Sequence, residues 1–292
     1  MPAEPASSPS ITLRTLARTA REGGRFACLT CYDATTARWL AKAGVQVLLV
    51  GDTAAEVILG LPGTIHAPLD FMITLTAAVQ RGAPGCVVMG DMPFMSYQVN
   101  QDQAMHNAAR FLTEGRADCV KLEVDRGWAP LVERLSRAGI PVVAHIGSRP
   151  QQAKSRGGNF SVGRTAEQAI GLLHDAAAME AAGASMLLVE AAPAEVTARI
   201  VERATIPVIG CGAGPACHGQ VVVLQDLLGL STWQPPFAAP AADLGAGIEA
   251  AARQWCETVR SSRVPDAYPM QPHELQRLQA MLLPVDPAHA KA

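Results

Sequence analysis

CVKLEVDRGWAPLVERLSRAGIPVVAH, residues 119–145, contains the pattern that decides the fold of this chain. An apolar run, Cys119–Glu123, is followed by an amphipathic stretch, Trp128–Arg137, and then by a second apolar run, Pro141–His145. Gly139 lies just after the amphipathic stretch, where a left-handed cap causes no Cβ clash. The segment therefore predicts a strand, a helix and a second strand that is parallel to the first.

The same unit repeats along most of the chain, because apolar runs of strand length alternate with amphipathic stretches. The predicted strands are Phe26–Tyr32, Val45–Gly51, Cys86–Gly90, Cys119–Glu123, Pro141–His145, Met186–Glu190 and Pro207–Gly210. The predicted helices are Thr35–Ala43, Leu69–Gln80, Gln101–Gly115, Trp128–Arg137, Ala166–Ala182, Ala194–Arg203 and Gly219–Leu228. An eighth strand is expected in Ser231–Phe237, followed by a helix over Gly245–Arg260.

Repeated strand–helix units predict the fold class α/β, with parallel strands and right-handed connections. Eight units in about 240 residues match the size of a single (β/α)8 barrel, also called a TIM barrel. An open, doubly wound parallel sheet is the alternative, and it would need a glycine-rich turn after the first strand. Tyr32-Asp33-Ala34-Thr35 is not such a turn, so the barrel is the favoured fold.

The barrel is expected to form a single catalytic domain over residues 11–262, between two short terminal segments. Residues 1–10 are rich in Pro, Ser and Ala and lack the basic and apolar regions of a signal peptide, which predicts a short disordered arm. Residues 263–292 form a C-terminal extension with a helix predicted over Glu274–Leu283. The apolar spacing within this helix suggests a contact with another subunit, which would make the protein a homo-oligomer.

Composition excludes several classes of function. With 24 Lys and Arg against 26 Asp and Glu in 292 residues, the formal net charge is −2, which provides no basic surface for nucleic acid. No apolar run approaches the roughly 18 residues that a membrane-spanning helix needs. Seven Cys without a framework spacing predict reduced thiols and a cytoplasmic location. We interpret the one CxxC pair, Cys28 and Cys31, as structural because both lie in a predicted buried strand.

Acidic residues end several of the predicted strands, namely Asp52, Asp91, Glu123 and Glu190. In a parallel barrel the carboxyl ends of the strands meet at one rim, and the catalytic groups come from this rim. Carboxylates that converge there repel one another and raise one another's pKa unless a cation lies among them. Oxygen ligands with open water positions are typical of Mg²⁺, so we predict a Mg²⁺ site with one further acid free for proton transfer.

Two more polar residues and a glycine cluster are expected on the same rim. Lys121 lies two residues before Glu123, so both side chains face the same side of the strand and Lys121 can bind an anionic substrate. His145 ends the fifth strand and is either a direct contact of the substrate or a hydrogen-bonded supporting group. Gly210-Cys211-Gly212-Ala213-Gly214 follows the seventh strand, where barrels often bind phosphate, but it can equally be a tight turn.

Short motifs in a fixed order carry a family resemblance. They are Thr30-Cys31-Tyr32-Asp33, Val50-Gly51-Asp52-Thr53, Arg81-Gly82-Ala83-Pro84, Gly90-Asp91-Met92-Pro93-Phe94, Val120-Lys121-Leu122-Glu123, Ala144-His145-Ile146-Gly147, Val189-Glu190 and Gly210-Cys211-Gly212-Ala213-Gly214. From about Ile11 to Tyr268, the chain resembles the ketopantoate hydroxymethyltransferase family, in the phosphoenolpyruvate mutase and isocitrate lyase superfamily.

The resemblance implies a Mg²⁺-dependent transfer of a hydroxymethyl group from 5,10-methylenetetrahydrofolate to the 2-oxo acid 3-methyl-2-oxobutanoate. The product is 2-dehydropantoate, on the route to pantothenate. Residues matching Asp52, Asp91 and Glu123 hold the metal in this family, and Glu190 matches its proton acceptor. Together with the rim residue His145, the expected substrate contacts are Asp52, Thr53, Asp91 and Lys121. Many members are decamers, so the resemblance also implies a homo-oligomer.

Several loops depart from the family pattern, which bears on the substrate. Thr53 replaces the usual serine and keeps its hydroxyl group. Other changes lie in Pro62–Pro68, in Ser148-Arg149 of the string Gly147–Gln151, in Asn159–Arg164 and at His218. Loops after barrel strands alter specificity while the chemistry is kept, so the alternative is a divergent Mg²⁺-dependent aldolase or lyase of 2-oxo acids without folate. A catalytically silent paralogue is disfavoured, because it has no use for four clustered acids.

Overall fold

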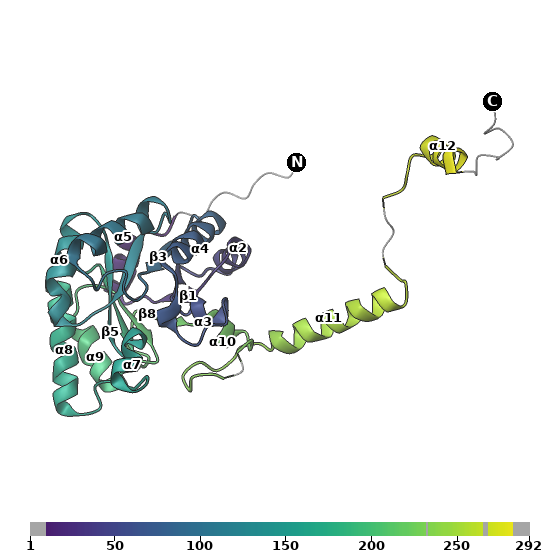
Figure 1. The fold of residues 1–292 in the computed structure, drawn as a ribbon. Helices are drawn as coiled ribbons and strands as arrows, with labels where there is room; N and C mark the ends of the chain where they lie inside the picture. The colour runs from purple at the N-terminus through teal and green to yellow at the C-terminus, as the bar shows by residue number, and fades with distance from the viewer. Residues whose placement is uncertain (1–9, 232, 265–267, 283–292) are drawn as a thin grey trace. The chain divides into compact units, whose positions relative to one another are not determined.

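The computed structural model describes residues 10–231, 233–264 and 268–282, and its central feature is a closed barrel of eight parallel strands. The strands follow one another around the barrel in the order β1 to β8. Figure 1 shows strands of this barrel at the centre of the surrounding helices, with β1, β3, β5 and β8 labelled. Their bounds are β1 Phe26–Thr30, β2 Val47–Val50, β3 Val87–Asp91, β4 Cys119–Glu123, β5 Val142–Gly147, β6 Met186–Glu190, β7 Val208–Cys211 and β8 Gly219–Val222. The predicted (β/α)8 barrel is confirmed.

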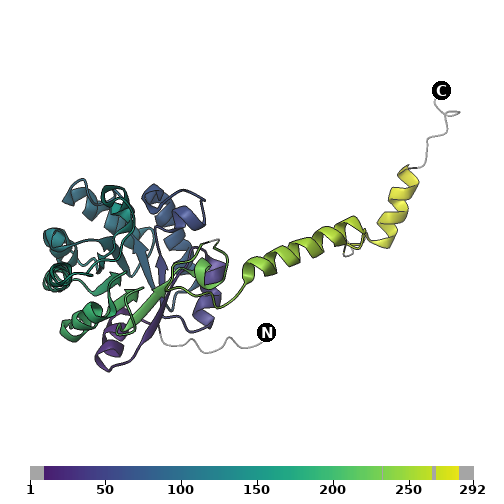
Figure 2. The same cartoon turned by 90° about the horizontal axis from the view of Figure 1, so that it is seen from below.

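Helices surround the strands, as the two views in Figures 1 and 2 show. The helices of the barrel unit are α1 Leu13–Arg21, α2 Ala34–Lys42, α3 Ala54–Val57, α4 Leu69–Gly82, α5 Gln101–Thr113, α6 Ala129–Arg137, α7 Ala153–Arg156, α8 Ala166–Ala181, α9 Ala194–Arg203 and α10 Leu224–Leu227. Short 3₁₀ helices lie at Thr64–His66 (η1), Arg126–Trp128 (η2) and Pro150–Gln152 (η3). Polar caps begin several helices: Asp33, Asn100 and Thr165 accept hydrogen bonds from the first-turn N–H groups of α2, α5 and α8.

The last strand of the barrel differs from the predicted one. The sequence predicts a helix over Gly219–Leu228 and a strand in Ser231–Phe237, and both predictions are wrong. Residues 219–222 form β8, which pairs with β1 on one side and β7 on the other. Residues 231 and 233–237 form no strand, and α10 alone is helical within 219–228. The cause is tertiary: the open edges of β7 and β1 need one more strand between them, and the valine-rich segment pairs with both.

Alternate positions of the strands fill the interior of the barrel. The interior cluster contains Leu16 of α1 and strand residues Phe26, Cys28, Val47, Leu49, Val87, Met89, Cys119, Val143, Met186, Leu188, Ile209 and Val221. The intervening strand residues pack outward against the helices in a second cluster. Because side chains alternate with a period of two, the next inward positions are polar: Asp91, Lys121, Glu123, His145 and Glu190. The apolar interior therefore ends in a layer of charged and polar groups at the carboxyl rim.

The cysteines of the CxxC pair lie on opposite sides of the barrel wall. Cys28 belongs to the interior cluster, whereas Cys31 packs in the outer cluster. Both thiols are buried and free, and burial raises their pKa. This placement agrees with the interpretation of the pair as structural.

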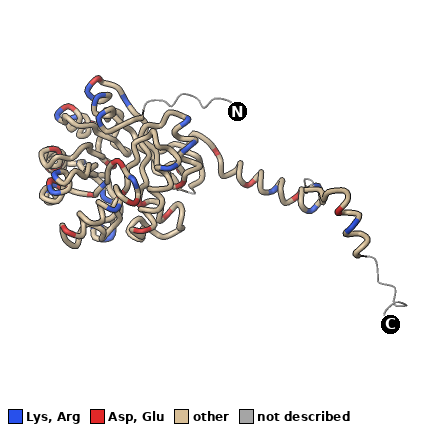
Figure 3. Tube along the Cα trace, turned by 90° about the horizontal axis from the view of Figure 1, so that it is seen from above, with Lys and Arg blue, Asp and Glu red and all other residues tan. Residues whose placement is uncertain are grey.

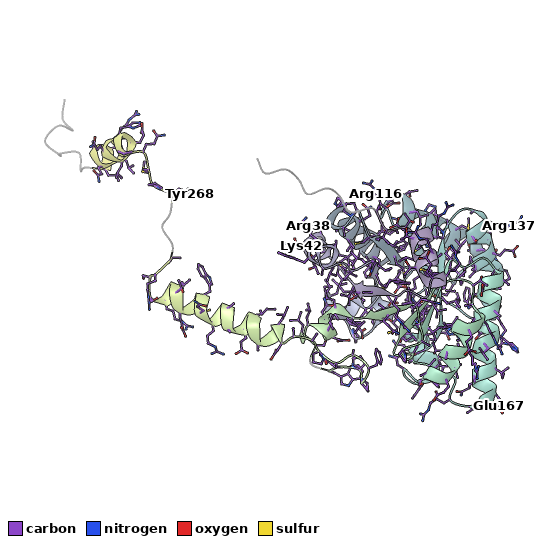
Figure 4. All side chains as sticks on the ribbon, turned by 180° about the vertical axis from the view of Figure 1, so that it is seen from behind. Arg38, Lys42, Arg116, Arg137, Glu167 and Tyr268 are labelled. Carbon is purple, nitrogen blue, oxygen red and sulfur yellow. The ribbon has the colours of Figure 1, made fainter. Side chains whose placement is uncertain are left out.

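Charged residues on the outside of the barrel are mixed in sign. Figure 3 shows Lys and Arg interspersed with Asp and Glu along the trace. In Figure 4, Arg38, Lys42, Arg116, Arg137 and Glu167 lie at the periphery of the barrel unit, far from its interior. Within the described ranges, no helix has the length and apolar character needed to cross a bilayer.

The chain divides into two compact units, Met1–Asp243 and Leu244–Ala292. The second unit contains α11 (Leu244–Arg260) and α12 (Pro272–Leu282), and neither helix has a buried residue. Helix α11 matches the helix predicted over Gly245–Arg260, and α12 matches the one predicted over Glu274–Leu283. Leu283 itself lies outside the described residues. The sequence boundary after residue 262 would assign α11 to the barrel, whereas the contacts group α11 with the residues that follow it. The predicted arm over residues 1–10 lies outside the described residues, apart from Ser10.

Candidate active site

A cavity of about 70 Å³ opens at the carboxyl ends of the strands. Residues from every part of the rim line it, and the ones that the sequence analysis proposed for the site are all among them: Asp52, Thr53, Asp91, Lys121, Glu123, His145 and Glu190. The strand register explains this convergence, because neighbouring parallel strands pair Asp91 with Lys121 and Glu123 with His145. Side chains that share a register position lie at the same height in the barrel.

Lys121 and Asp91 form a buried ion pair at the floor of the cavity. The ammonium Nζ lies 2.7 Å from both carboxylate oxygens of Asp91, and the two side chains are 6% and 1% exposed. The backbone N–H of Asp52 donates to Oδ2 of the same carboxylate at 3.0 Å. Burial alone would lower the pKa of Lys121, but the charges of Asp91, Asp52 and Glu123 outweigh it and raise that pKa. Lys121 is therefore a permanent cation, and its third N–H remains for an anionic ligand.

Glu123 has one bonded and one unbonded carboxylate oxygen. Oε2 accepts a hydrogen bond from the backbone N–H of Gln151 at 3.0 Å. Oε1 is buried and finds no hydrogen-bond partner in the described part of the chain. Burial, together with the charges of Asp52, Asp91 and Glu190, raises the pKa of Glu123 well above its ordinary value, although Lys121 opposes this. An acidic cluster of this kind is electrostatically incomplete without a cation.

Glu190 differs from the other rim acids because it is the one that reaches solvent in the cavity. Its side chain is 23% exposed, and Oε2 lies 3.4 Å from Nε2 of the buried His145. Burial raises the pKa of Glu190 to about 7, with Asp52 and Asp91 adding to the shift and Lys121 opposing it. The pKa of His145 is lowered well below its usual range, first by burial and then by Lys121 and Arg149, so its imidazole is neutral. A carboxylate with a pKa near 7 is suited to accept a proton from a substrate.

The end of β5 determines where the backbone of Glu190 lies. Gly147 pairs with Glu190 and has a φ of +95°, a conformation that residues with a side chain rarely adopt. A Cβ at this position would clash with the carbonyl oxygen of Glu190. The next residue, Ser148, donates its N–H to the same oxygen at 2.9 Å. Gly147 therefore permits the close approach of β5 to β6 at the rim.

We expect Gly147→Ala to lower the free energy of unfolding by about 2 kcal/mol, because left-handed strain and the clash with Glu190 act together. Turnover should fall as well, since Glu190 must move. Urea unfolding and steady-state kinetics measure the two effects. Gly85→Ala is the matched control, because a Cβ at Gly85 has no atom within 4 Å; equal losses in both variants would contradict the argument.

The loops that depart from the family pattern are distributed over several parts of the barrel. Thr64 of the Pro62–Pro68 segment lines the cavity, whereas His66, Arg149 and His218 do not. Arg149 forms an ion pair with Asp125 at 2.6 Å and lines a neighbouring cavity. His218 lies before β8, where its Nδ1 accepts a hydrogen bond from the N–H of Val208 at 3.0 Å. The altered residues that could change specificity most directly are therefore Thr53 and Thr64.

The glycine cluster after β7 is a tight turn. Gly212 and Gly214 both have positive φ values, of +59° and +83°. A Cβ on Gly212 would contact the ring of Phe237 at 2.5 Å, and a Cβ on Gly214 would contact Ala194 at 2.5 Å. Of the cluster, Cys211 alone lines the rim cavity. These glycines are required for close packing, which is the second of the two interpretations that the sequence leaves open.

Sequence reasoning did not identify Gln151 and Tyr97 as part of the site. The Gln151 side chain donates to Oδ2 of Asp52 at 2.9 Å, and the Tyr97 hydroxyl lies 3.0 Å from Oε1 of Gln151. Gln151 belongs to the string Gly147–Gln151, which follows β5 directly. Its position after a barrel strand was therefore a sequence signal for a place at the active-site rim. Tyr97 lies in the loop before α5, and its sequence context carries no comparable pattern.

The donor set around the cavity fits Mg²⁺ bound through part of the carboxylate cluster. In residues 10–231, 233–264 and 268–282, no three His, Cys, Asp or Glu side chains form a group that could hold a metal ion alone. Mg²⁺ usually binds through one or two carboxylates and completes its shell with water and substrate oxygens. The unpaired Oε1 of Glu123 and the neighbouring carboxylates of Asp52 and Asp91 provide such oxygens.

Comparison with known proteins places the chain in a family. The profile described as ketopantoate hydroxymethyltransferase matches residues 10–267. A 3-methyl-2-oxobutanoate hydroxymethyltransferase of Hyperthermus butylicus is 40% identical over 280 residues, which cover 95% of this chain and 97% of that protein. One from Thermobifida fusca is 44% identical over 256 residues, covering 88% and 91%.

The fold has solved counterparts as well. The crystal structure of 2,3-dimethylmalate lyase, described as a PEP mutase/isocitrate lyase superfamily member, matches with a TM-score of 0.55 and 18% identity, covering 94% of this chain and 96% of that one. That similarity supports the barrel architecture. The family profile covers most of the chain, and the two relatives are 40% and 44% identical to it. The chain therefore belongs to the ketopantoate hydroxymethyltransferase family of enzymes.

Proposed function

We propose that this enzyme catalyses the Mg²⁺-dependent transfer of a hydroxymethyl group from 5,10-methylenetetrahydrofolate to 3-methyl-2-oxobutanoate, which yields 2-dehydropantoate. The observation that carries the proposal is the position of Glu190, whose pKa is raised to about 7, at a cavity that also holds Lys121 and the other rim acids. A 2-oxo acid has a carboxylate to be bound and an acidic carbon next to its carbonyl. Both needs are met by groups on this rim.

Lys121 binds the substrate. Two of its N–H donors are held by Asp91, so the ammonium is fixed in direction, and the third donor is available to the substrate carboxylate. Thr53 lines the same cavity and offers a hydroxyl group to a substrate oxygen. Because Lys121 belongs to β4 and Thr53 directly precedes α3, both groups are held by the barrel and orient the substrate before the reaction begins.

Glu190 moves the proton. Its carboxylate takes the proton from the substrate carbon next to the carbonyl, and that carbon forms a bond to the methylene carbon of the folate donor. The two bonds from this methylene carbon to folate nitrogens break, and a water molecule supplies the hydroxyl group of the product. Tetrahydrofolate leaves after its two nitrogens take up one proton from Glu190 and one from that water. Mg²⁺ would be held by one or two of the carboxylates of Asp52, Asp91 and Glu123, with water and substrate oxygens completing its shell, and it would supply Lewis-acid stabilisation of the charge that develops on the 2-oxo group. The ring of His145, whose pKa is lowered by burial, lies 3.4 Å from Oε2 of Glu190 and does not compete with it for the proton.

The assay that tests the proposal uses purified protein with Mg²⁺, 3-methyl-2-oxobutanoate and either methylenetetrahydrofolate or formaldehyde. Formation of 2-dehydropantoate with the folate donor is the expected result. Exchange of the C3 proton of the substrate without product would instead favour the folate-independent aldolase or lyase. This alternative is considered because the Pro62–Pro68 and Asn159–Arg164 segments depart from the family pattern. Absence of both exchange and product would contradict an enzymatic role for this rim.

The raised pKa of Glu190 also predicts a pH-dependent stability difference. Metal-free Glu190→Gln protein should gain stability over the parent protein as the pH rises from 5 to 8, by about 2 kcal/mol. The folded-state pKa, about 7, lies above the ordinary value of 4.5, so deprotonation in this interval costs free energy in the folded parent only. Glutamine has no proton to lose.

Urea unfolding at pH 5 and pH 8 with a chelator present measures the difference. Glu195→Gln, at an exposed position of α9, is the matched control and should show no such trend. A stability difference between Glu190→Gln and the parent that stays constant with pH would show that Glu190 titrates normally.

A further inference from the structure

Gln151 lies in the short 3₁₀ helix η3 and is only 4% exposed. Both its side chain and its backbone N–H form hydrogen bonds to other parts of the rim. Its side-chain Nε2 donates to Oδ2 of Asp52 at 2.9 Å and to the carbonyl oxygen of Met92 at 3.0 Å. Its Oε1 accepts from Nε2 of Gln98 at 3.1 Å and lies 3.0 Å from the hydroxyl of Tyr97. Its backbone N–H donates to Oε2 of Glu123 at 3.0 Å.

These contacts leave the Gln151 amide a single orientation. A backbone carbonyl oxygen only accepts hydrogen bonds, so the group facing the carbonyl of Met92, and with it Asp52, has to be the NH₂ group. The other end of the amide then faces the donors Tyr97 and Gln98. Every hydrogen-bonding position of the side chain is used, and a side chain whose rotamer is determined in this way is a rigid support.

Gln151 joins two carboxylates that no strand pairing joins directly. Asp52 follows β2 and Glu123 ends β4, with β3 between them in the barrel. Their charges repel, and both are buried, so each would turn away from the other if nothing held it. One bond from the side chain of Gln151 and one from its backbone fix a single oxygen of each carboxylate. Oε1 of Glu123 is left unbonded in the described part of the chain.

We propose that Gln151 is a positioning residue that presets the carboxylates of Asp52 and Glu123 for binding a divalent cation. This inference rests on the proposed function, because that function is what requires the cation. Tyr97 extends the support: its hydroxyl also accepts the N–H of Glu123 at 3.1 Å, and its ring packs edge-on against Trp128 with centroids 5.6 Å apart. The support therefore connects the loop after β5 to the loop after β3.

Replacement of Gln151 by Met tests the inference. Methionine has a similar length but cannot donate to Asp52, whereas the backbone bond to Glu123 is retained. Affinity for Mn²⁺, followed by electron paramagnetic resonance without substrate, should fall about 10- to 100-fold, the range found when residues supporting metal ligands are replaced. In kinetics, kcat should recover when the Mg²⁺ concentration is raised, because the catalytic groups themselves are unchanged. Gln152→Met, at the next position, is the matched control and should bind Mn²⁺ as the parent protein does.

The outcomes separate the inference from the proposed function. Mn²⁺ binding by the parent and by Gln151→Met with the same affinity overturns the role of Gln151 and leaves the proposed function intact. Absence of Mn²⁺ binding by the parent overturns both. Reduced kcat that no Mg²⁺ concentration restores, with unchanged Mn²⁺ affinity, identifies a merely structural residue.

A second variant covers the case in which Gln151→Met does not fold. Tyr97→Phe keeps the ring and its packing but removes the hydroxyl that holds Oε1 of Gln151 and the backbone of Glu123. It should weaken Mn²⁺ binding in the same direction by a smaller factor, about threefold to tenfold. Unchanged affinity in this variant also overturns the inference.

Discussion

Glu190→Gln is expected to lower turnover by about 10²- to 10⁴-fold, the range that positioned general bases contribute. Glutamine has nearly the same shape as glutamate, so the cavity and the contact with His145 should persist. It cannot accept the proton from the carbon next to the substrate carbonyl. Deuterium exchange at C3 of 3-methyl-2-oxobutanoate, followed by NMR in D₂O, measures this step apart from the transfer of the one-carbon unit.

Binding measurements make the Glu190 result specific. Affinity for Mg²⁺ and for the 2-oxo acid should remain measurable in Glu190→Gln, because Lys121 and the carboxylate cluster are intact. Glu195→Gln, on the exposed surface of α9, should exchange at the parent rate. Exchange at the parent rate in Glu190→Gln would place the base on another residue.

Asp91→Asn is expected to have the largest effect on the folded protein, with a loss of about 3 kcal/mol in the free energy of unfolding. The substitution leaves the ammonium of Lys121 buried at 6% exposure without the carboxylate that bonds it at 2.7 Å. It also replaces one of the carboxylates assigned to the metal by a neutral amide, so Mn²⁺ affinity should fall. Urea unfolding and Mn²⁺ titration measure the two losses independently.

Two controls separate these consequences. Asp70→Asn removes a carboxylate that is 83% exposed and paired with Arg110, and it should leave both quantities nearly unchanged. The double variant Asp91→Leu with Lys121→Met replaces the buried ion pair by apolar side chains, and it should regain most of the lost stability but no Mn²⁺ binding. Full stability in Asp91→Asn alone would contradict the account of the ion pair.

The strand–helix pattern predicted most of the barrel because it is local. Runs such as Cys119–Glu123 and Met186–Glu190 match their strands to the residue, since a strand buried on both faces is mainly apolar and polar residues mark the part that reaches the rim. Gly139 and Gly183 both have positive φ values after α6 and α8, where the sequence expects left-handed caps. Local hydrophobicity and cap chemistry were sufficient for these elements.

The eighth strand was mispredicted for the opposite reason. Gly219–Val222 is too short to show a periodicity, and it follows β7 after a turn with no intervening helix in the described chain. What makes it a strand is the pair of open edges on β7 and β1, which exist only when the other strands have closed into a barrel. Gly219 also has to be glycine because the ring of Phe26 occupies the place of its Cβ.

The sequence by itself determined that this protein is a parallel barrel and that Asp91, Glu123 and Glu190 end strands while Asp52 follows one, because a strand's burial and its last residues are local properties. Only the tertiary structure decided how these groups act on one another. The raised pKa of Glu190, the bond from Lys121 to Asp91 and the bonds from Gln151 to Asp52 and Glu123 join segments far apart in the chain. Such effects depend on distance and desolvation, and both are set when the barrel closes.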